Sequence, residues 1–336
     1  MGSLEREDDG GRRERLAGWV AAVCPSCDGR LEPASTDASF RRYYRVRRDD
    51  GKTLIVMDAP PDREKPATFV DLAQRFGALG IHVPAVHAHD LEQGFVLLED
   101  LGATAYLDVL GEDNVDRLYG DALSTLEVLQ AQGPRQGLPA YDRELLEREL
   151  DIFTEWLLGR HLGITPSPPE QRMLDEVFGI LVRNALEQPQ VCVHRDFHSR
   201  NLMVASPPSP GVIDFQDAVV GPVTYDLVSL LRDCYIAWPP ERVDDWAWGY
   251  FERAARSGVL EPWHESRFLR WFDLMGVQRH LKAAGIFARL KHRDGKGGYL
   301  GDVPRTLRYI DHVARRLPDL QALGRFLGER VFPGLG

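Results

Sequence analysis

The chain has few cysteines, four in 336 residues. A disulfide framework in a chain of this length would need more of them, so we expect a hydrophobic core to stabilise the fold. Residues 24–27 (C-P-S-C) bring two of the four close together, but further zinc ligands at similar spacing and a βαβ context are both missing. We therefore interpret this C-x-x-C pair as a chance occurrence without a metal or redox role.

Long apolar runs are missing as well. A membrane-spanning helix needs about 20 consecutive apolar residues, and no segment approaches that length. Residues 1–15 are polar and charged, unlike the apolar segment of a signal peptide. We expect a cytoplasmic protein, a monomer, that does not bind a membrane.

The chain also lacks a positive net charge. Its value of −10 at pH 7 argues against general nucleic-acid binding and leaves a small molecule as the expected partner. The charge is uneven, because residues 279–308 carry eight basic and two acidic side chains. This basic segment is either a solvated helix face or a pocket for an anionic substrate group, and the sequence leaves both alternatives open.

The most informative motif that is present reads H-R-D-F-H-S-R-N at residues 194–201 and I-D-F at residues 213–215. This order and spacing are typical of the catalytic and metal-binding loops of kinase-like phosphotransferases. Asp196 would accept the proton of a substrate hydroxyl, and Asn201 and Asp214 would hold magnesium against the phosphates of ATP. The alternative is that these residues are ordinary polar groups in a loop. The presence of all of them in the expected order favours the catalytic interpretation.

The segments around the motif support this interpretation. Residues 191–193, 202–204 and 212–213 are short apolar runs typical of strands, and residues 206–211 (S-P-P-S-P-G) predict a turn. Two short strands joined by this turn would bring Asn201 and Asp214 close to each other.

Periodicity predicts a small β-rich lobe followed by helices. Strands are expected at 40–47, 53–57 and 95–98, with a hairpin at Asp50-Gly51 and helices at 16–23 and 66–79. Further helices are expected at 114–130, 141–161, 170–187, 225–235, 242–256, 267–290, 304–317 and 320–327. The predicted fold is α+β, bilobal and protein-kinase-like, with the active site in the cleft. Its parts are an N-lobe at 1–98 with residues 1–14 disordered, a hinge at 99–102 and a helical C-lobe at 103–336.

The nucleotide would bind under the first strands, where protein kinases have a glycine-rich loop. This chain has no glycine between Gly29 and Gly51, so small polar residues and arginine would have to contact the phosphates. The hinge backbone would bind the adenine edge. The predicted nucleotide contacts are Thr36, Asp37, Ala38, Ser39, Phe40, Arg41, Glu99 and Leu101. A plain turn capped by serine and threonine is the alternative for residues 35–39.

A lysine at the end of the third strand is missing too, because that position holds Asp58. Protein kinases bind the α- and β-phosphates with this lysine, and a carboxylate cannot do so without a metal ion. Arg41, Arg42 or Lys65 would supply the cation, or the nucleotide would bind differently. Asp226 opens a predicted helix, and it either caps this helix or braces the catalytic-loop backbone.

On these residues the chain resembles the aminoglycoside-phosphotransferase family of small-molecule kinases, from about residue 35 to the C-terminus. Within the family it is most similar to bacterial kinases that phosphorylate amino sugars at the anomeric carbon. Asp58 and the D-F-Q sequence depart from protein kinases but fit this group. The strings that carry the similarity include S-T-D-A-S-F-R-R-Y (35–43), V-M-D-A-P-P (56–61), L-L-E-D-L-G (97–102), I-D-F-Q-D-A (213–218), Q-R-H-L-K (278–282) and G-I-F-A-R-L (285–290).

The resemblance implies ATP- and Mg²⁺-dependent phosphorylation of the C1 hydroxyl of N-acetylmuramate and N-acetylglucosamine. The product would be the α-1-phosphate, in peptidoglycan recycling toward UDP-N-acetylmuramate. An anomeric hydroxyl is more acidic than other sugar hydroxyls, so a carboxylate is an adequate base. The lactyl carboxylate of N-acetylmuramate would pair with a cation of the basic segment. The expected substrate contacts are Asp196, His198, Arg279, His280 and Arg289.

Two other functions stay open. A kinase of the same family for aminoglycosides, choline or homoserine has the same catalytic residues, but polycationic aminoglycosides need an acidic pocket, which the basic segment does not offer. A pseudokinase that binds nucleotide without turnover would explain the missing lysine. However, Asp196, Asn201 and Asp214 are all present, which favours an active enzyme.

Overall fold

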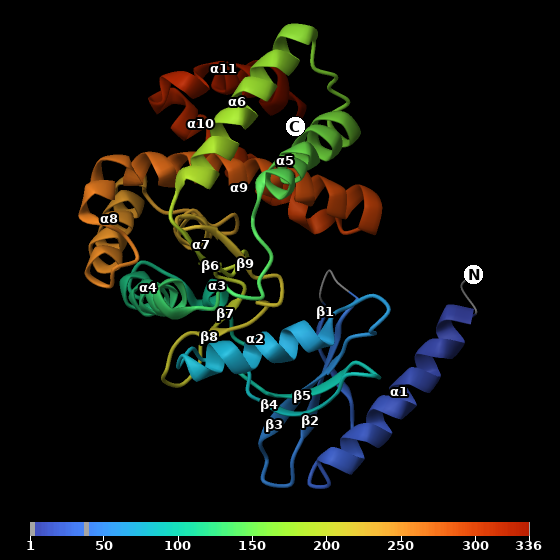
Figure 1. Ribbon diagram of the computed structural model, residues 1–336. Coiled ribbons are helices and arrows are strands. Elements are labelled where there is room, and N and C mark those ends of the chain that lie inside the picture. The colour runs from blue at the N-terminus through green and yellow to red at the C-terminus, as the bar shows by residue number, and fades with distance from the viewer. Residues whose placement is uncertain (1–3, 37–39, 336) are drawn as a thin grey trace. The chain divides into compact units, whose positions relative to one another are not determined.

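The structure, a computed structural model, describes residues 4–36 and 40–335, with side chains from residue 11 onward except at 35 and 36. It divides into two units (Figure 1). Unit 1 comprises Met1–Thr104 and Met203–Gln216, and unit 2 comprises Ala105–Leu202 and Asp217–Gly336. Unit 1 is built around a sheet and unit 2 is mainly helical, so the predicted α+β class is confirmed.

Unit 1 contains a five-stranded sheet with the order β1-β2-β3-β5-β4, in which every neighbouring pair is antiparallel. The predicted hairpin joins β2 to β3 and pairs Arg47 with Thr53. Gly51 lies in this turn with φ +80°, a conformation that costs glycine little. The bounds are β1 (Glu32–Thr36), β2 (Arg42–Arg47), β3 (Thr53–Asp58), β4 (Val86–Asp90) and β5 (Phe95–Glu99). Strands β1 and β4 were not predicted, and β4 has no buried residue to mark it in the sequence.

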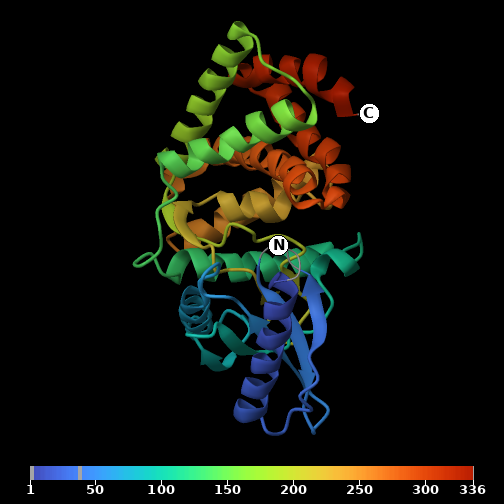
Figure 2. The ribbon, with the colours of Figure 1, turned by 90° about the vertical axis from the view of Figure 1, so that its right-hand side faces the viewer.

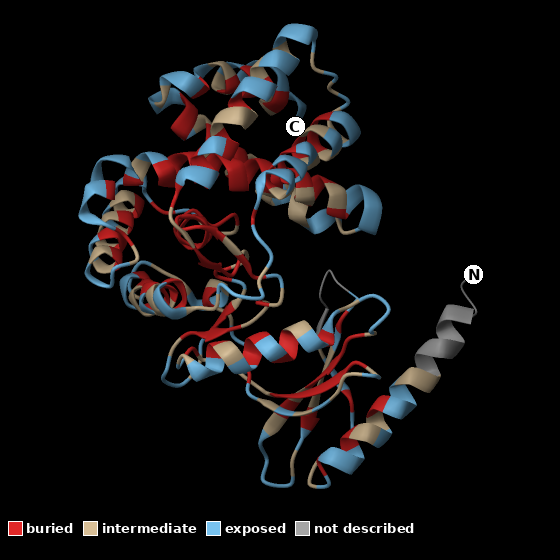
Figure 3. Cartoon of the chain, viewed as in Figure 1, coloured by how far each residue is buried: buried red, intermediate tan, exposed pale blue. Residues whose placement is uncertain are grey.

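Helix α1 (Leu4–Val23) packs on one face of this sheet, as Figures 2 and 3 show. Leu16 and Val20 are completely buried in a cluster that also contains Val56 and Phe95. The predicted disorder of residues 1–14 is therefore wrong from residue 4 onward. Local sequence gave no sign of this longer helix, because what holds it is contact with strands that follow later in the chain.

An ion pair fastens the first described turns of α1 to the strand end that lacks the kinase lysine. The Arg12 guanidinium donates to Asp58 Oδ1 at 2.6 Å and to the Gln93 carbonyl oxygen at 2.7 Å. It also lies 4.9 Å from the centre of the Phe95 ring. Asp58 is buried. The residue that departs from protein kinases thus holds a structural salt bridge.

We expect Arg12→Met to destabilise the protein by about 2 kcal/mol, because it leaves the buried Asp58 carboxylate without its charged partner. The midpoint of urea unfolding would measure this loss. Arg48→Met is the matched control, since Arg48 pairs with Asp50 at the surface and such pairs contribute below about 1 kcal/mol. Equal unfolding midpoints for the two variants would contradict the structural role of Arg12.

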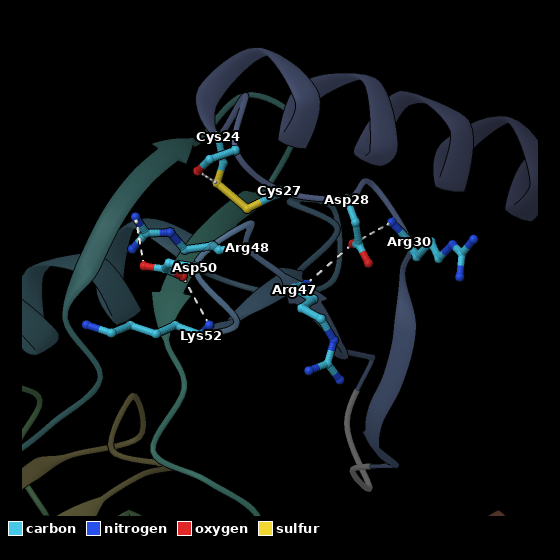
Figure 4. The surroundings of a disulfide bond; sticks show 9 residues. Cys24, Cys27, Asp28, Arg30, Arg47, Arg48, Asp50 and Lys52 are labelled. Atoms are coloured by element: carbon cyan, nitrogen blue, oxygen red, sulfur yellow. Dashed lines mark hydrogen bonds and ion pairs between the residues drawn. A yellow bond between two sulfur atoms is a disulfide. The ribbon is translucent and has the colours of Figure 1, made fainter.

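The cysteines of the C-x-x-C pair form a disulfide bond, which corrects their interpretation as a chance occurrence (Figure 4). A turn after α1 lets the Cys27 amide donate to the Cys24 carbonyl oxygen at 2.9 Å, and the two Cα atoms lie 5.5 Å apart, a separation typical of disulfides. The backbone amide of Asp28, the next residue, donates to the Arg47 carbonyl oxygen at 2.8 Å. The disulfide therefore closes a turn that is hydrogen-bonded to the end of β2.

Unit 2 is organised around α9 (Glu265–Asp294), a 30-residue helix whose middle is almost entirely buried. All eight helices predicted for this part of the chain are present, the second continuing into the π-helix η1. The remaining helices of the unit are α3 (Tyr106–Val109), α4 (Val115–Gln132), α5 (Arg143–Ile152), η1 (Phe153–His161), α6 (Pro168–Glu187), α7 (Tyr225–Leu231), α8 (Pro240–Arg256), η2 (Pro262–His264), η3 (Gly297–Asp302), α10 (Val303–Arg316), η4 (Pro318–Leu320), α11 (Gln321–Phe326), η5 (Leu327–Val331) and η6 (Phe332–Leu335).

Short strands frame the catalytic motif. Strand β6 (Gln190–Val193) pairs antiparallel with β9 (Val219–Pro222), and β7 (Leu202–Met203) pairs with β8 (Gly211–Val212). The strands predicted before and after the motif are therefore confirmed. Helix α2 (Pro66–Ala78) completes unit 1. None of the helices in the described part of the chain has both the length and the apolarity needed to cross a membrane.

Candidate active site

The H-R-D-F-H-S-R-N loop of unit 2 begins directly after β6, and Asp226 holds its backbone. The amide of His194 donates to Asp226 Oδ2 at 2.6 Å, and that of Arg195 donates to Oδ1 at 2.9 Å. Arg195 has φ +78°, a conformation that costs energy in a residue other than glycine and is found where surrounding contacts enforce it. Of the two roles left open for Asp226, these bonds establish the brace of the catalytic-loop backbone.

Asp233 braces the middle of the same loop. Both the amide and the hydroxyl of Ser199 donate to Asp233 Oδ2, at 2.9 and 2.5 Å, and the Tyr235 amide donates to Oδ1 at 2.9 Å. The amide nitrogen of the Asn201 side chain donates to the Asp196 carbonyl oxygen at 3.0 Å. The loop is therefore fixed at both ends. Asp233 was missed in the sequence, where nothing distinguishes it from other acidic residues near the end of a helix.

Four neighbouring cationic or titratable groups act on the Asp196 carboxyl. Burial alone would raise its pKa, but Lys282, His198, Arg279 and Arg195 together lower it below the ordinary value. Asp196 is thus a carboxylate at neutral pH. In this state it accepts a proton or a hydrogen bond from a hydroxyl group, as the sequence motif predicts.

A buried ion network lies behind this carboxylate and was not found in the sequence. Glu149 of α5 accepts hydrogen bonds from Arg195 at 2.5 Å and from the Tyr141 hydroxyl, and pairs with Lys282 at 2.9 Å. Lys282 also donates to the Tyr225 hydroxyl at 3.0 Å. Burial would raise the pKa of Glu149, but Lys282 and Arg195 outweigh this effect and lower it. The network fixes two of the cations that keep Asp196 charged.

We expect Glu149→Gln to destabilise the protein by about 3–5 kcal/mol, because it leaves two buried cations without a carboxylate. Urea unfolding would measure this, with Glu147→Gln, an exposed pair with Arg143, as the control. Because the pKa of Glu149 is lowered on folding, its stabilisation is complete above the unfolded value of about 4.3 and is lost as the pH falls below it. A variant with wild-type stability at pH 7 would contradict the network.

Two of the predicted sugar contacts interact with Asp196. His198 is buried, burial lowers its pKa, and its Nδ1 atom has no hydrogen-bond partner in the described part of the chain. Arg279 is 6% exposed, and its one hydrogen bond to the described residues is a donation to Cys234 Sγ at 3.5 Å, a weak acceptor. A buried neutral histidine and a buried guanidinium with unused donors beside the base are typical of a site that binds polar ligands.

The other two predicted sugar contacts have different neighbours. His280 bonds to the Arg232 carbonyl oxygen at 2.8 Å and stacks on Tyr309, and burial lowers its pKa to about 3. Burial, and then Arg293, lower the pKa of Arg289, whose remaining electrostatic neighbours are Asp294 and Glu155 rather than the catalytic loop. Arg279, His280 and Arg289 all belong to α9, but their positions along the helix give them different neighbours.

Asp214 of the I-D-F motif lies in unit 1, directly after β8. Its φ is +66°, a left-handed conformation that aspartate tolerates better than most residues. Its Oδ1 accepts from the Gln216 side chain at 2.8 Å. Phe215, the next residue, packs between Phe69 and Phe76 of α2, with ring centres 4.9 and 5.7 Å away. The aromatic contacts anchor the motif and position the carboxylate.

Arg41 is the cation that the structure brings to Asp214. Its Nη2 atom lies 3.1 Å from Asp214 Oδ1, and its Nε atom lies 3.9 Å from Glu64. The Arg41 side chain is 8% exposed. Arg42 and Lys65, the other two candidates for replacing the missing lysine, are exposed. Unit 1 therefore contains a pair between buried Arg41 and the partly exposed Asp214, with Glu64 as an acidic neighbour.

The remaining predicted nucleotide contacts are described in part. Asp37, Ala38 and Ser39 lie outside the described residues, and Thr36 is described only as the end of β1. The Phe40 amide donates to Glu64 Oε1 at 3.1 Å, and its ring is 57% exposed.

The hinge residues have defined backbone partners. The Glu99 amide donates to the Ala85 carbonyl oxygen at 2.9 Å, and a Glu99 carboxylate oxygen accepts from the Ala85 amide at 3.2 Å. Asp100 pairs with Arg45 at 2.5 Å. Leu101, the next residue, has no backbone amide bond to the described residues.

Comparison with known proteins places this geometry in a family. The sequence model of the phosphotransferase enzyme family matches residues 30–268. A protein of Pseudomonas putida named N-acetylmuramate/N-acetylglucosamine kinase is 48% identical, and the alignment covers 90% of this chain and 88% of the relative. A Pseudomonas aeruginosa protein of the same name is 46% identical, with 95% and 97% covered.

Solved structures show the same fold at low sequence identity. Choline kinase LicA from Streptococcus pneumoniae superposes with a TM-score of 0.63 at 14% identity, covering 90% of this chain and 98% of that one. An aminoglycoside phosphotransferase in complex with ADP and hygromycin B gives 0.58 at 14% identity, with 89% and 97% covered. The predicted kinase-like fold is therefore confirmed, while such distant likeness carries no information on the substrate.

Proposed function

Because the chain belongs to the phosphotransferase enzyme family, we propose that it is an ATP-dependent kinase of N-acetylmuramate and N-acetylglucosamine. It transfers the γ-phosphoryl group to the C1 hydroxyl and forms the α-1-phosphate, a step of peptidoglycan recycling in the cytoplasm. The observation that carries the proposal is the near-full-length identity of 48% and 46% to two kinases of that name. The ionised, braced Asp196 supports the catalytic part.

In this mechanism Asp196 orients the C1 hydroxyl and takes its proton as the oxygen meets phosphorus. The low pKa of an anomeric hydroxyl suits a carboxylate base whose own pKa is below the ordinary value. Lys282 and Arg279 keep this carboxylate charged. Neutral His198 has a buried ring nitrogen without a partner in the described region, which supports a hydrogen bond to a sugar hydroxyl.

Asn201 and Asp214 would hold magnesium. Both offer the hard oxygen ligands that this ion prefers, and the bond from the Asn201 amide nitrogen to Asp196 leaves the amide oxygen as its metal-binding end. Among the described residues no cluster of three or more histidine, cysteine or acidic side chains forms a metal cage. This fits an ion held by few protein ligands together with phosphates, and bound magnesium supplies neutralisation of phosphate charge.

The nucleotide contacts follow the same reasoning. Buried Arg41 is the cation closest in role to the missing lysine, and its pairing with Asp214 supports a place beside the metal-bound phosphates. Thr36, Asp37, Ala38, Ser39 and Phe40 would line the phosphate turn. The backbone of Glu99 and Leu101 would bind adenine, supported by the unused amide of Leu101. Arg279, His280 and Arg289 stay candidates for sugar contacts.

The test is phosphorus NMR of the products formed from ATP and a panel of acceptors. We expect a sugar 1-phosphate from N-acetylmuramate and from N-acetylglucosamine, and none from kanamycin, choline or homoserine. The coupling of phosphorus to the anomeric proton identifies C1 as the acceptor. Turnover of kanamycin without turnover of either amino sugar would replace the proposal by an aminoglycoside kinase, and binding of ATP without any product would make the chain a pseudokinase.

A further inference from the structure

Arg200 of the catalytic loop lies against two tyrosines from other segments of unit 2. Its guanidinium carbon is 4.3 Å from the centre of the Tyr235 ring and 5.3 Å from that of Tyr299. Tyr235 follows α7, and Tyr299 lies in η3. The aromatic faces thus hold the position of this cation, as cation–π contacts do.

Among the described residues Arg200 has no acidic partner, because no carboxylate there lies within 4.0 Å of its guanidinium. Several other arginines of unit 2 do pair with acids. A guanidinium that stacks on a ring keeps its N–H donors in its own plane, directed past the ring. The hydroxyls of Tyr235 and Tyr299 act on Arg200 as neutral hydrogen-bond partners. A carboxylate is a stronger acceptor than a tyrosine hydroxyl, and the guanidinium fork can bind it in two parallel hydrogen bonds. The paired arginines are Arg195 with Glu149, Arg232 with Asp273, Arg242 with Asp116 and Arg305 with Asp302.

An aromatic surface connects Arg200 to the region of the base. The His198 and Tyr235 rings meet edge to face with centres 5.4 Å apart. Tyr235 lies 6.1 Å from Phe287, which stacks on Tyr299 at 5.9 Å. His198 in turn interacts electrostatically with Asp196. His198 and Phe287 are buried, whereas Tyr235 and Tyr299 are partly exposed. The two tyrosines are therefore the members that can pack against the apolar face of a sugar ring.

We propose that Arg200 binds the lactyl carboxylate of N-acetylmuramate and is the residue that distinguishes this acidic sugar from N-acetylglucosamine. The inference rests on the proposed function. The two sugars differ only in the lactyl group on O3, and the reacting oxygen is on C1. The carboxylate therefore lies away from Asp196, along the surface that runs from His198 to Tyr235 and ends at Arg200.

The electrostatic neighbours of Arg279 support different roles for Arg279 and Arg200. Arg279 acts on Asp196 and Asp233 directly, so it belongs to the reacting end of the site, where both sugars are alike. The largest charges that act on Asp196 are Lys282, His198, Arg279 and Arg195, whereas Arg200 helps to lower the pKa of His198. We therefore expect removal of the charge at Arg200 to affect recognition of the O3 substituent more than it affects the base.

The test compares kcat/KM for the two sugars in wild type, Arg200→Met and Arg200→Lys. We expect Arg200→Met to lower kcat/KM for N-acetylmuramate by about 10- to 100-fold, mainly through KM, as expected for loss of a charge-assisted bidentate contact. N-Acetylglucosamine should change less than about twofold, which also shows that the variant is folded. Arg200→Lys should recover part of the loss. Arg293→Met, at an exposed pair with Asp294, is the matched control and should change neither sugar.

A neutral substrate tests the same contact without changing the protein. The amide of the N-acetylmuramate lactyl group keeps the shape of the acid but not its charge, so wild type should use it less well, and Arg200→Met should not distinguish amide from acid. Equal losses with both sugars, no loss with either, or a variant that still distinguishes acid from amide would overturn the role of Arg200. A wild-type enzyme that phosphorylates neither sugar would overturn the proposed function as well.

Discussion

Replacing Asp196 with asparagine should lower kcat for N-acetylmuramate by about 10²- to 10⁴-fold, the range that a positioned general base contributes. Asparagine keeps the size of the side chain and still orients a hydroxyl, but its amide cannot take the proton from C1–OH. The substitution leaves the Asp226 and Asp233 braces of the loop backbone intact. The affinity for ATP should therefore change by less than about twofold. An ADP-release assay and calorimetric ATP titration measure the two quantities.

Asp175→Asn is the control for Asp196→Asn. Asp175 is an exposed residue of α6 in the same unit, and the same atoms are exchanged there without effect on either quantity. Wild-type kcat in Asp196→Asn would remove Asp196 as the base. A parallel loss of ATP affinity would show that Asp196 binds the nucleotide rather than the acceptor.

Asp214→Asn should weaken the binding of ATP in the presence of magnesium by at least about tenfold, because the ion loses its carboxylate ligand. The affinity for ATP in EDTA should stay near the wild-type value. Asparagine is the appropriate replacement because it tolerates the φ of +66° at this position, so backbone strain does not confuse the result. Calorimetric titrations with and without magnesium give both affinities.

Asp71→Asn provides the comparison for Asp214→Asn. Asp71 forms an exposed pair with Arg75 on α2, in the same unit, so its loss removes one negative charge far from any predicted ligand. Unchanged magnesium-dependent affinity in Asp214→Asn would exclude Asp214 as a metal ligand. A loss of ATP affinity that persists in EDTA would instead indicate that the Arg41–Asp214 pair acts on the nucleotide directly.

The parts of the site that could be predicted from the sequence are those with local signals. The catalytic loop and the I-D-F motif lie within stretches of a few residues, and their flanking strands and turn are encoded beside them. Helices of unit 2 were found for the same reason, since apolar spacing of three and four residues is a property of a short window. Strand β4 was not predicted, because none of its side chains is buried and it lacks a clear apolar pattern.

Two further misses concern contacts between distant segments. Helix α1 extends to residue 4 beyond the predicted start, while later strands bury Leu16 and Val20 and Asp58, 46 residues away, pairs with Arg12. The basic segment could not be resolved into its members, because each side of α9 meets different neighbours. Arg279 interacts electrostatically with Asp196, whereas His280 stacks on Tyr309.

The sequence by itself predicted the fold class and the family correctly, and it named Asp196 as the base and Asn201 and Asp214 as metal ligands, which stay predictions. These properties depend on residue types at fixed short spacings. Only the tertiary structure decided what supports them: Asp226 and Asp233 hold the loop, Glu149 binds the cations behind it, and aromatic rings position Arg200. The physical reason is that burial and charge pairing depend on which segments pack together, and a pattern along the chain does not specify those partners.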